Sequence, residues 1–568
     1  MFKIKLMLFL CLALQQLDFY GQSGRIPVEA SNGMVVSSHY LGSETGVAIL
    51  QMGGNAIDAS IATAFTLAVT LPSAGNIGGG GFLLYKPVNA ESTAFNFREK
   101  APEKATKTMF LGEDGKVKDN SNHETSLSAG VPGTVAGLYQ AHSNAGKLDW
   151  ATLVQPAIDL AKNGFAVYPD LARFSRWVYE NKEEYASTAA VFLNDEGEAY
   201  STGDTIVQKD LAASLTRIRD YGAEGFYKGK TAQLIEDFMR STNGIITKKD
   251  LENYESAEVQ PLRGSYRGYG IIGMPPPSSG GTAVIEMLNI LENYDLQEYG
   301  LHSAQSIHLI SEAMRRAFAD RAQFLGDPEF NPEMPLDTLL SKSYAHRLQA
   351  SVIEKQASVS DSSNFNKKHL QYESEETTHI SVVDKEGNAV SLTYTLEHSY
   401  GNRIVVEGAG FLLNNEMGDF NAIPGLTNSE GRIGTVPNQI APGKRMLSSM
   451  SPTIVTLNDK AYLVIGSPGG RTIINTVLQV ILNVVDYELD IAKAIESPKF
   501  HHQWLPDVIT FEEWGFSPDT IAILKSYGHE TGTRSSQGRA MGIIIDPESG
   551  AYYGAADSRS YMGQAVGY

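Results

Sequence analysis

A β-hairpin that directly follows a polar segment is the feature around which this sequence can be organised. Residues 355–376 are rich in serine and charge and hold few large apolar side chains. Residues 380–384 then alternate as a strand does, residues 385–388 have turn chemistry, and residues 389–395 are again β-branched. We therefore predict an exposed, mobile linker that ends at the Glu376–Thr377 bond and leads into a hairpin.

Two threonines open this hairpin, and they allow two interpretations. Threonine is common in strands, so Thr377 and Thr378 can be an ordinary strand start. A threonine at a chain terminus can also be a nucleophile, because its own α-amine, with a pKa of about 7.7–8.0, can take the hydroxyl proton. An internal peptide nitrogen has no such basicity. Thr377 could therefore act in this way only after the bond to Glu376 is cut.

The N-terminus has the pattern of a secretory signal. Two lysines precede an apolar run, residues 6–14, that is too short to span a bilayer, and small residues precede a cut after Ser23. We predict that residues 1–23 are a signal peptide, that the protein is periplasmic or secreted, and that it has no membrane span. Cys11, the only cysteine, lies in this segment, so the mature chain would have no thiol nucleophile, thiolate metal site or disulfide.

The charge of the chain excludes one class of partner. The net charge is −19, and loss of residues 1–23 removes two lysines and one aspartate and leaves −20. Because such an acidic surface repels phosphates, we expect no nucleic-acid partner.

Helical periodicity predominates in the first two thirds of the chain. We predict that Ser43 caps a helix over residues 45–52 and that Asn55 and Asp58 form a capping box for a helix over residues 56–71. Apolar residues at three- and four-residue spacing predict five more helices. These cover residues 150–163, 206–221, 230–243, 282–293 and 303–324.

A glycine-rich turn, residues 466–470, lies between a predicted strand over residues 461–465 and a helix from Arg471. It is not a phosphate-binding P-loop, because three residues rather than four separate its outer glycines and Arg471 stands where lysine is needed. It can be a tight turn, or a pair of amides that stabilises an oxyanion.

Other polar clusters are ambiguous by themselves. Ser448 and Ser449 follow a basic pair, and Glu416 and Asp419 are two carboxylates three residues apart. No G-x-S-x-G or H-E-x-x-H motif occurs. Adjacent His501 and His502 have no spaced partner, so we predict no metal site.

Six segments in order make the chain resemble the γ-glutamyltransferases, a family of the N-terminal nucleophile hydrolases. They are residues 97–102, 274–281, 377–379, 414–420, 447–452 and 466–470. The resemblance implies an α+β fold, a four-layer αββα sandwich. It also implies a precursor that cuts itself into a large subunit, residues 24–376, and a small subunit, residues 377–568, which form a heterodimer without a cofactor.

The resemblance also implies roles for single residues. Thr377 would be the nucleophile and new N-terminus, and Thr395 would position it. Gly469 and Gly470 would supply the oxyanion amides. The α-carboxylate of the substrate would be held by Arg98, Ser448 and Ser449, and its α-ammonium by Glu416 and Asp419, with Glu397 added to that pocket.

Some positions depart from the common family pattern. Glu397 stands where many members have asparagine, Gly418 where the acidic pair is often Asp-Asp, and Met446 where proline usually follows Lys-Arg. Residues 424–443 resemble a lid loop, with Glu430 near the place of a lid aromatic.

Three functions remain in competition. The first is transfer of the γ-glutamyl group of glutathione and related compounds to water or to amino acids and peptides. The second is an acylase for glutaryl-type β-lactam side chains, which Arg98 and Asp419 disfavour because a glutaryl group has no α-ammonium. The third is a non-catalytic periplasmic binding protein, which would need no chain cut.

Overall fold

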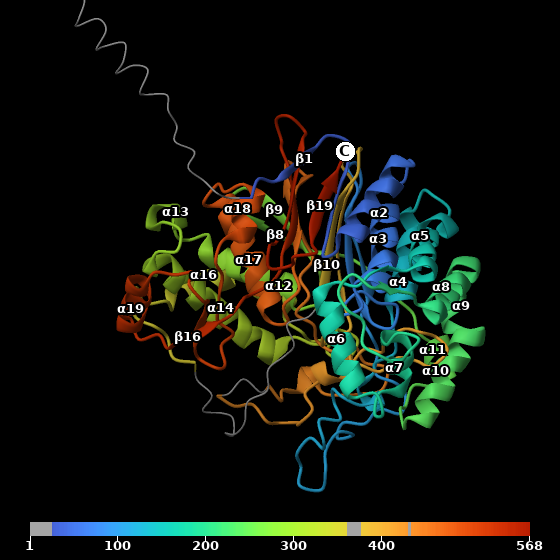
Figure 1. Cartoon of the computed structure of the whole chain (residues 1–568). Coiled ribbons are helices and arrows are strands. Elements are labelled where there is room, and N and C mark those ends of the chain that lie inside the picture. Colours follow the sequence, from blue (N-terminus) through green and yellow to red (C-terminus); the bar gives the residue numbers. More distant parts are fainter. Residues whose placement is uncertain (1–24, 361–376, 430–432) are drawn as a thin grey trace, which may run out of the picture.

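Two β-sheets packed face to face form the centre of the molecule, with helices outside each sheet. The computed structural model describes residues 25–360, 377–429 and 433–568. Helices α2 (Tyr40–Gln51) and α3 (Ala56–Thr70) cover one sheet, and α12 (Gly280–Leu291) and α17 (Thr472–Val485) cover the other (Figure 1). The predicted α+β, four-layer αββα sandwich is confirmed.

The sheet that carries the hairpin has seven antiparallel strands. Its order is β19 (Gln564–Gly567), β2 (Met34–Ser37), β10 (Thr378–Val383), β11 (Ala389–Thr395), β3 (Gly80–Lys86), β4 (Thr93–Phe97) and β7 (Ala257–Val259). The predicted hairpin is β10 and β11, with Thr378 opposite Tyr394. One sheet therefore combines strands from before and after the linker, with β2 between β19 and β10.

The second sheet also has seven antiparallel strands and mixes the same two parts of the chain. Its order is β1 (Val28–Ala30), β18 (Tyr552–Ala556), β17 (Met541–Ile545), β13 (Lys460–Gly466), β12 (Thr453–Leu457), β9 (Tyr269–Gly273) and β8 (Leu262–Tyr266). Smaller sheets join β5 (Phe165–Ala166) to β6 (Thr205–Ile206), and β15 (Ile509–Glu512) to β14 (Phe500–His501) and β16 (Thr531–Arg534).

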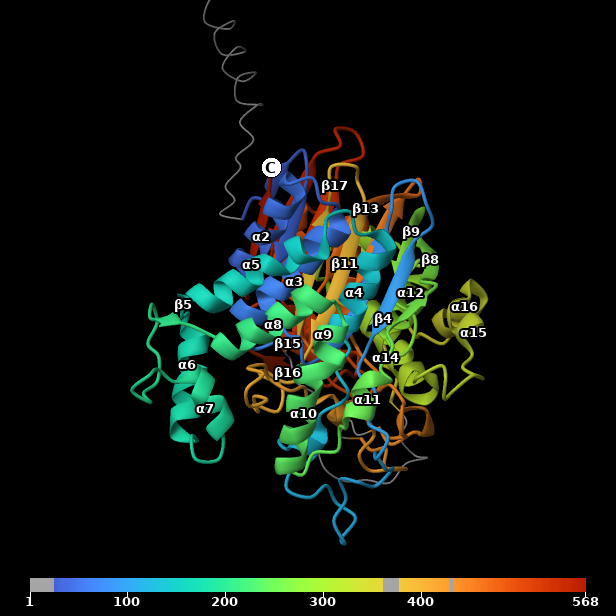
Figure 2. The ribbon, with the colours of Figure 1, turned by 90° about the vertical axis from the view of Figure 1, so that its right-hand side faces the viewer.

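The helices over the hairpin sheet follow local sequence signals closely, with one exception. α3 (Ala56–Thr70) has the predicted capping box of Asn55 and Asp58. The predicted cap at Ser43 is wrong, because α2 (Tyr40–Gln51) begins earlier and His39 caps it by accepting the Leu41 amide. The other helices on this side, several of which face the viewer in Figure 2, are α4 (Thr134–Ala145), α5 (Trp150–Asn163), α6 (Pro169–Glu180), α7 (Ala186–Phe192), α8 (Lys209–Tyr221), α9 (Glu224–Tyr227), α10 (Gly229–Ser241) and α11 (Lys248–Glu252).

Three longer helices and five shorter ones lie outside the second sheet within the described residues. α12 (Gly280–Leu291) is buried along its whole length, and α14 (Ala304–Phe324) and α17 (Thr472–Val485) pack beside it. The shorter ones are α13 (Leu296–Tyr299), α15 (Leu336–Leu339), α16 (Lys342–Ala350), α18 (Ile491–Glu496) and α19 (Pro518–Ser526).

Polar side chains of the hairpin lie between the two sheets. His379 of β10 bonds Thr393 through Nδ1 (2.8 Å) and Ser381 through Nε2 (3.0 Å). Ser381 donates to the Met541 carbonyl of the opposite sheet. A Cβ at Gly466 would lie 2.3 Å from the His379 ring, so this position has no room for a side chain. The hairpin is thereby fixed against β13 and β17.

The described part of the predicted linker, residues 355–360, is anchored. The Ser358 amide donates to Glu312, and the Ser360 amide donates to Asp507 (2.7 Å). Composition alone had indicated an exposed, mobile segment. These contacts are made by residues distant in the chain, which a local pattern does not reveal. The Glu376 side of the cleavage site lies outside the described residues, as do the predicted signal peptide and Glu430.

Candidate active site

Thr377 lies directly before β10, opposite the end of β11. One step beyond the Thr378–Tyr394 pair brings Thr377 opposite Thr395, and its hydroxyl donates to Thr395 Oγ1 at 3.4 Å. Thr395 Oγ1 also accepts the Glu397 amide at 2.9 Å. Thr377 is buried, with 7% of its surface exposed. The hairpin register thus places two hydroxyls together at one end of the hairpin.

A buried arginine lies among three carboxylates beside these hydroxyls. Arg98, which follows β4, contacts Glu416 Oε2 at 2.6 Å, Asp419, and Glu99 Oε2 at 3.5 Å. Glu416 and Asp419 both come from one 3₁₀ turn, Glu416–Asp419. The cluster therefore holds charges of both signs within reach of a small ligand, as recognition of an amino-acid zwitterion requires.

Within the described part of the chain, this cluster holds three carboxylates but only one cationic side chain, Arg98, that contacts them. Burial raises the pKa of Glu416 well above its ordinary value, although Arg98 opposes the shift. Burial likewise raises the pKa of Glu99 to about 7. Among the described residues, Glu416 Oε1 has no hydrogen-bond partner. A ligand ammonium placed here would supply the positive charge that these groups lack.

A second arginine, which sequence reasoning missed, supports the serine pair. Arg321 of α14 donates to Ser449 Oγ at 2.9 Å and to Ser279 Oγ at 2.8 Å. Ser279 in turn donates to the Ser448 carbonyl. Ser448 Oγ accepts the Met450 amide. Arg321 is 128 residues from Ser449, so no local signal could have found it.

The glycine turn after β13 needs glycine. Gly469 has φ of 136° and Gly470 has φ of 54°, and a Cβ at Gly469 would lie 2.6 Å from Thr472 Oγ1. Both residues precede α17, and no side chain at the N-cap position accepts a hydrogen bond from the first amides of this helix. Amides at this end of a helix favour a negative charge.

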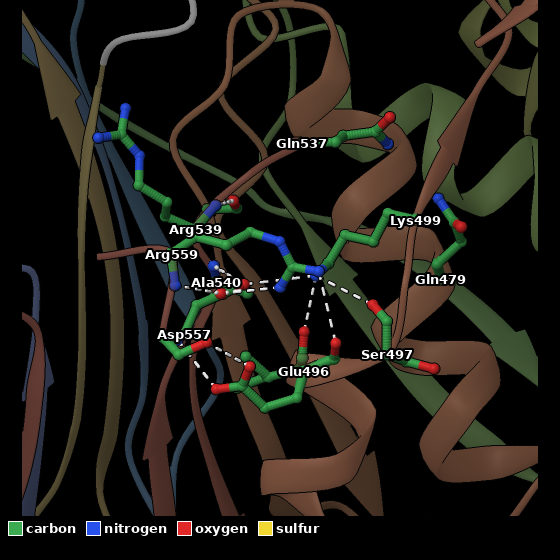
Figure 3. A network of polar contacts seen from close by, with 12 residues as sticks. Gln479, Glu496, Ser497, Lys499, Gln537, Arg539, Ala540, Asp557 and Arg559 are labelled. Carbon is green, nitrogen blue, oxygen red and sulfur yellow. Dashed lines mark hydrogen bonds and ion pairs between the residues drawn. The ribbon is translucent and has the colours of Figure 1, made fainter. Parts of the chain in front are cut away.

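A network of charged side chains, drawn in part in Figure 3, is connected to this turn. Lys499 contacts Asp557 at 3.3 Å, and Arg559 bridges Asp557 (2.9 Å) and Glu512 (2.7 Å). The Ala540 amide donates to Asp557, and the preceding Arg539 amide donates to Ser467 Oγ within the glycine turn. The network thereby connects the turn to the C-terminal strands.

One small cavity brings the predicted site together. It is lined by Arg98, Thr377, Thr395, Glu397, Glu416, Asp419, Ser448, Ser449 and Gly470, together with Met450 and Ile473, which were not predicted. Gly469 is the one predicted residue of the described part that does not line it. Its neighbour Gly470 does, so the turn reaches the cavity through Gly470.

A sandwich of two sheets, with a strand that starts at a buried threonine in a polar cavity, defines the class of N-terminal nucleophile hydrolases. The profile of the γ-glutamyltranspeptidase family matches residues 42–567, and this chain belongs to that family.

Relatives and solved structures agree with this assignment. The glutathione hydrolase proenzyme of Escherichia coli K12 is 45% identical over 546 residues, which cover 95% of this chain and 93% of the relative. A cephalosporin acylase from Bacillus halodurans is 27% identical with a TM-score of 0.84, over 97% of this chain and 98% of that one. The γ-glutamyltranspeptidase of Helicobacter pylori is 43% identical with a TM-score of 0.55, over 60% and 95%.

None of the helices within the described residues has the length and apolarity that crossing a membrane requires.

Proposed function

We propose that this chain is a self-processing γ-glutamyltransferase. It transfers the γ-glutamyl group of glutathione and related compounds to water, or to amino acids and peptides, through a γ-glutamyl ester on Thr377. The observation that carries the proposal is the single cavity in which the Thr377 hydroxyl lies beside Thr395 and the Arg98–Glu416–Asp419 cluster.

Maturation is the first step. The Thr377 hydroxyl attacks the carbonyl carbon of Glu376. The acyl group moves from the nitrogen of Thr377 to its side-chain oxygen, so the peptide bond becomes an ester. Water then hydrolyses the ester and leaves a carboxylate on Glu376 and an α-amine on Thr377. The large subunit would be residues 24–376 and the small subunit residues 377–568, held as a heterodimer.

Turnover uses the α-amine that maturation exposes. In its neutral form the amine takes the Thr377 hydroxyl proton, and the oxygen attacks the γ-carbonyl carbon of the substrate. The amides of Gly469 and Gly470 stabilise the oxyanion, and the leaving amine takes the proton. Water or an acceptor amine then attacks the ester and regenerates Thr377.

Charge at both ends of the glutamyl group selects the substrate. The guanidinium of Arg98, with the hydroxyls of Ser448 and Ser449, holds the α-carboxylate. Glu416, Asp419 and Glu397 hold the α-ammonium. Together these contacts place the γ-carbonyl at the nucleophile, which lowers the entropic barrier to attack.

The decisive experiment compares wild type with Thr377→Ala on a denaturing gel and by N-terminal sequencing. Wild type should give two bands, with the smaller beginning at Thr377, and Thr377→Ala should stay one chain. Thr377→Ser is the matched control, because it keeps a hydroxyl and should still be cut. A wild-type protein that remains one band would support the binding-protein alternative instead.

A covalent trap tests the nucleophile itself. A γ-glutamyl-type electrophile should leave its adduct on Thr377 when the labelled peptide is located by mass spectrometry. An adduct on Ser448, Ser449 or Thr378, with Thr377 unmodified, would overturn the assignment.

The glutaryl acylase remains the second candidate, because the cephalosporin acylase shares the fold. A glutaryl group carries no ammonium, so it would leave Glu416 and Asp419 without their proposed ligand. We expect a γ-glutamyl anilide to be turned over much faster than the matching glutaryl anilide. The reverse order would favour the acylase.

Export is also a proposal. Residues 1–23 would direct the precursor to the periplasm or the medium and be removed after Ser23. Sequencing of the large subunit should then begin at Gly24, whereas retention of Met1 in exported protein would exclude this cut.

A further inference from the structure

Two histidines flank Glu397 at the wall of the active-site cavity. His398 Nε2 lies 3.0 Å from Glu397 Oε1, and His123 Nδ1 lies 3.5 Å from Glu397 Oε2. The two imidazole rings are parallel, with centroids 4.6 Å apart and an interplanar angle of 3°. All three donor atoms lie within 4.8 Å of one another.

Backbone geometry and a missing side chain create this arrangement. Glu397 lies two residues beyond the end of β11 and has φ of 80°, and its carboxylate contacts the ring of the next residue. On the other side, a Cβ at Gly418 would lie 2.2 Å from the His123 ring. Glycine at 418 therefore makes room for His123.

We propose that His123, Glu397 and His398 bind one divalent transition-metal ion of the zinc class. Two imidazole nitrogens and one carboxylate oxygen are a ligand set that zinc accepts in a tetrahedral site, with water in the fourth position. Zinc–ligand bonds of about 2.0–2.1 Å place tetrahedral ligand atoms about 3.3 Å apart. The two nitrogens lie 3.0 and 3.5 Å from different oxygens of Glu397, which is close to that separation. Because an imidazole binds a metal in its ring plane, at least one of the stacked rings would turn when the ion binds.

Charge and access favour a cation at this place. The Glu397 carboxylate is buried, and one imidazole ring lies beside each of its oxygens. A cation at this place would therefore meet the carboxylate and two imidazole nitrogens together. The His398 side chain is 27% exposed and gives the ion a path from solvent.

A second cluster of similar composition is a poor alternative. His308, Glu312 and His529 also lie close together, but Arg315 and Arg316 already pair with Glu312. His308 Nδ1 and His529 Nε2 are bonded to each other at 2.8 Å. Two guanidiniums beside the carboxylate would repel a divalent ion, so this cluster serves as an internal control.

A metal at Glu397 would change how the cavity binds substrate. Glu397 lines the cavity with Thr377, so the ion would place positive charge where the proposed function puts the α-ammonium. We therefore expect the ion to compete with γ-glutamyl donors. This consequence rests on the proposed function, whereas binding of the ion does not.

The test uses Co²⁺ as a spectroscopic probe on the full mature protein. Wild type should take up one equivalent, with visible absorption typical of four-coordinate cobalt, and Zn²⁺ should displace it. Mg²⁺ should not, because it prefers all-oxygen sites. His398→Gln and His123→Gln should each weaken cobalt binding about tenfold or more, since even outer-shell changes cost about that much.

Control variants separate the possible outcomes. His346→Gln, on an exposed helix position, and His529→Gln, in the second cluster, should bind cobalt as wild type does. Unfolding temperatures near that of wild type would show that His398→Gln is folded. Undiminished binding in both His398→Gln and His123→Gln, loss of binding in His529→Gln, or no uptake by folded wild type would overturn the site. If a saturating γ-glutamyl donor does not weaken cobalt binding, the proposed competition between ion and donor is wrong, but the metal site itself is not contradicted.

Discussion

At the scale of single residues, the site depends on buried charge. Arg98 is almost fully buried and also donates through Nε to the Met446 carbonyl (3.4 Å) and through Nη2 to the Leu447 carbonyl (3.3 Å). These bonds fix the plane of the guanidinium. The same plane faces Glu416 and Asp419, so this one side chain orients both halves of the proposed substrate pocket.

Arg98→Lys should lower kcat/KM by about 10- to 1000-fold. Lysine keeps the charge but loses the planar fork, and a hydrogen bond to a charged group contributes roughly 1.5–3 kcal/mol. Steady-state kinetics with a γ-glutamyl anilide measure the effect, with the exposed Arg240→Lys as the matched control. Unaltered kinetics in Arg98→Lys would show that this arginine does not contact the substrate.

The reaction should depend on the protonation of one group, the Thr377 α-amine. Attack needs the neutral amine, so kcat/KM should rise with pH through an apparent pKa near its reference range of about 7.7–8.0. A pH–rate profile of the mature enzyme measures this. A profile that falls across that range would exclude the amine as the base.

At the scale of elements, local signals were predictable and distant contacts were not. The capping box of α3 lies within four residues and was identified correctly, as was the hairpin of β10 and β11. The start of α2 was missed because the cap is a histidine nitrogen, which is an unusual N-cap acceptor. Most of the residues that line the cavity with Thr377 were predicted from the family resemblance. Arg321 and the rings around Glu397 were not, since they come from segments far apart in the chain.

The glycine turn gives a prediction at this scale. Gly469→Ala should lower kcat by about 10- to 1000-fold, because the new Cβ would meet Thr472 and move the proposed oxyanion amides. Gly197→Ala is the matched control, since Gly197 also has positive φ (75°) but nothing near its Cβ position. Equal kinetics in the two variants would show that the turn does not serve catalysis.

At the scale of the whole molecule, buried histidines should make stability sensitive to acid. Burial lowers the pKa of His379 to about 3 and those of His39 and His302 to about 4. In the unfolded chain these groups titrate near about 6.5. The unfolded state therefore binds more protons below that pH, so this stability is present above about pH 6.5 and is lost as pH falls toward 4.

The size of this effect can be measured at His379. From pH 7.5 to 5, protonation of one unfolded histidine should cost the folded state roughly 2 kcal/mol. Urea unfolding of the uncut Thr377→Ala chain should show a lower free energy of unfolding at pH 5 than at pH 7.5. Adding His379→Gln should make this decrease smaller by roughly 2 kcal/mol. His346→Gln is the exposed control. An identical pH dependence with and without His379 would contradict the prediction.

Both sheets contain strands from each side of the proposed cut. β2 lies between β19 and β10, and β11 pairs with β3. We expect the cut protein to elute as one species of full mass under native conditions, and its two chains to separate only in denaturant. Separation of the chains in native buffer would contradict the interleaved topology.

The same interleaving bears on how the gene can be organised. Neither half could complete a sheet by itself, since both sheets take strands from both halves. A single reading frame solves this, because translation delivers the two future polypeptides in equal number and already threaded through each other. Two separate genes would need matched expression, and their products would have to insert strands into each other's sheets. A cut after folding is therefore the simpler way to give an internal threonine a terminal amine.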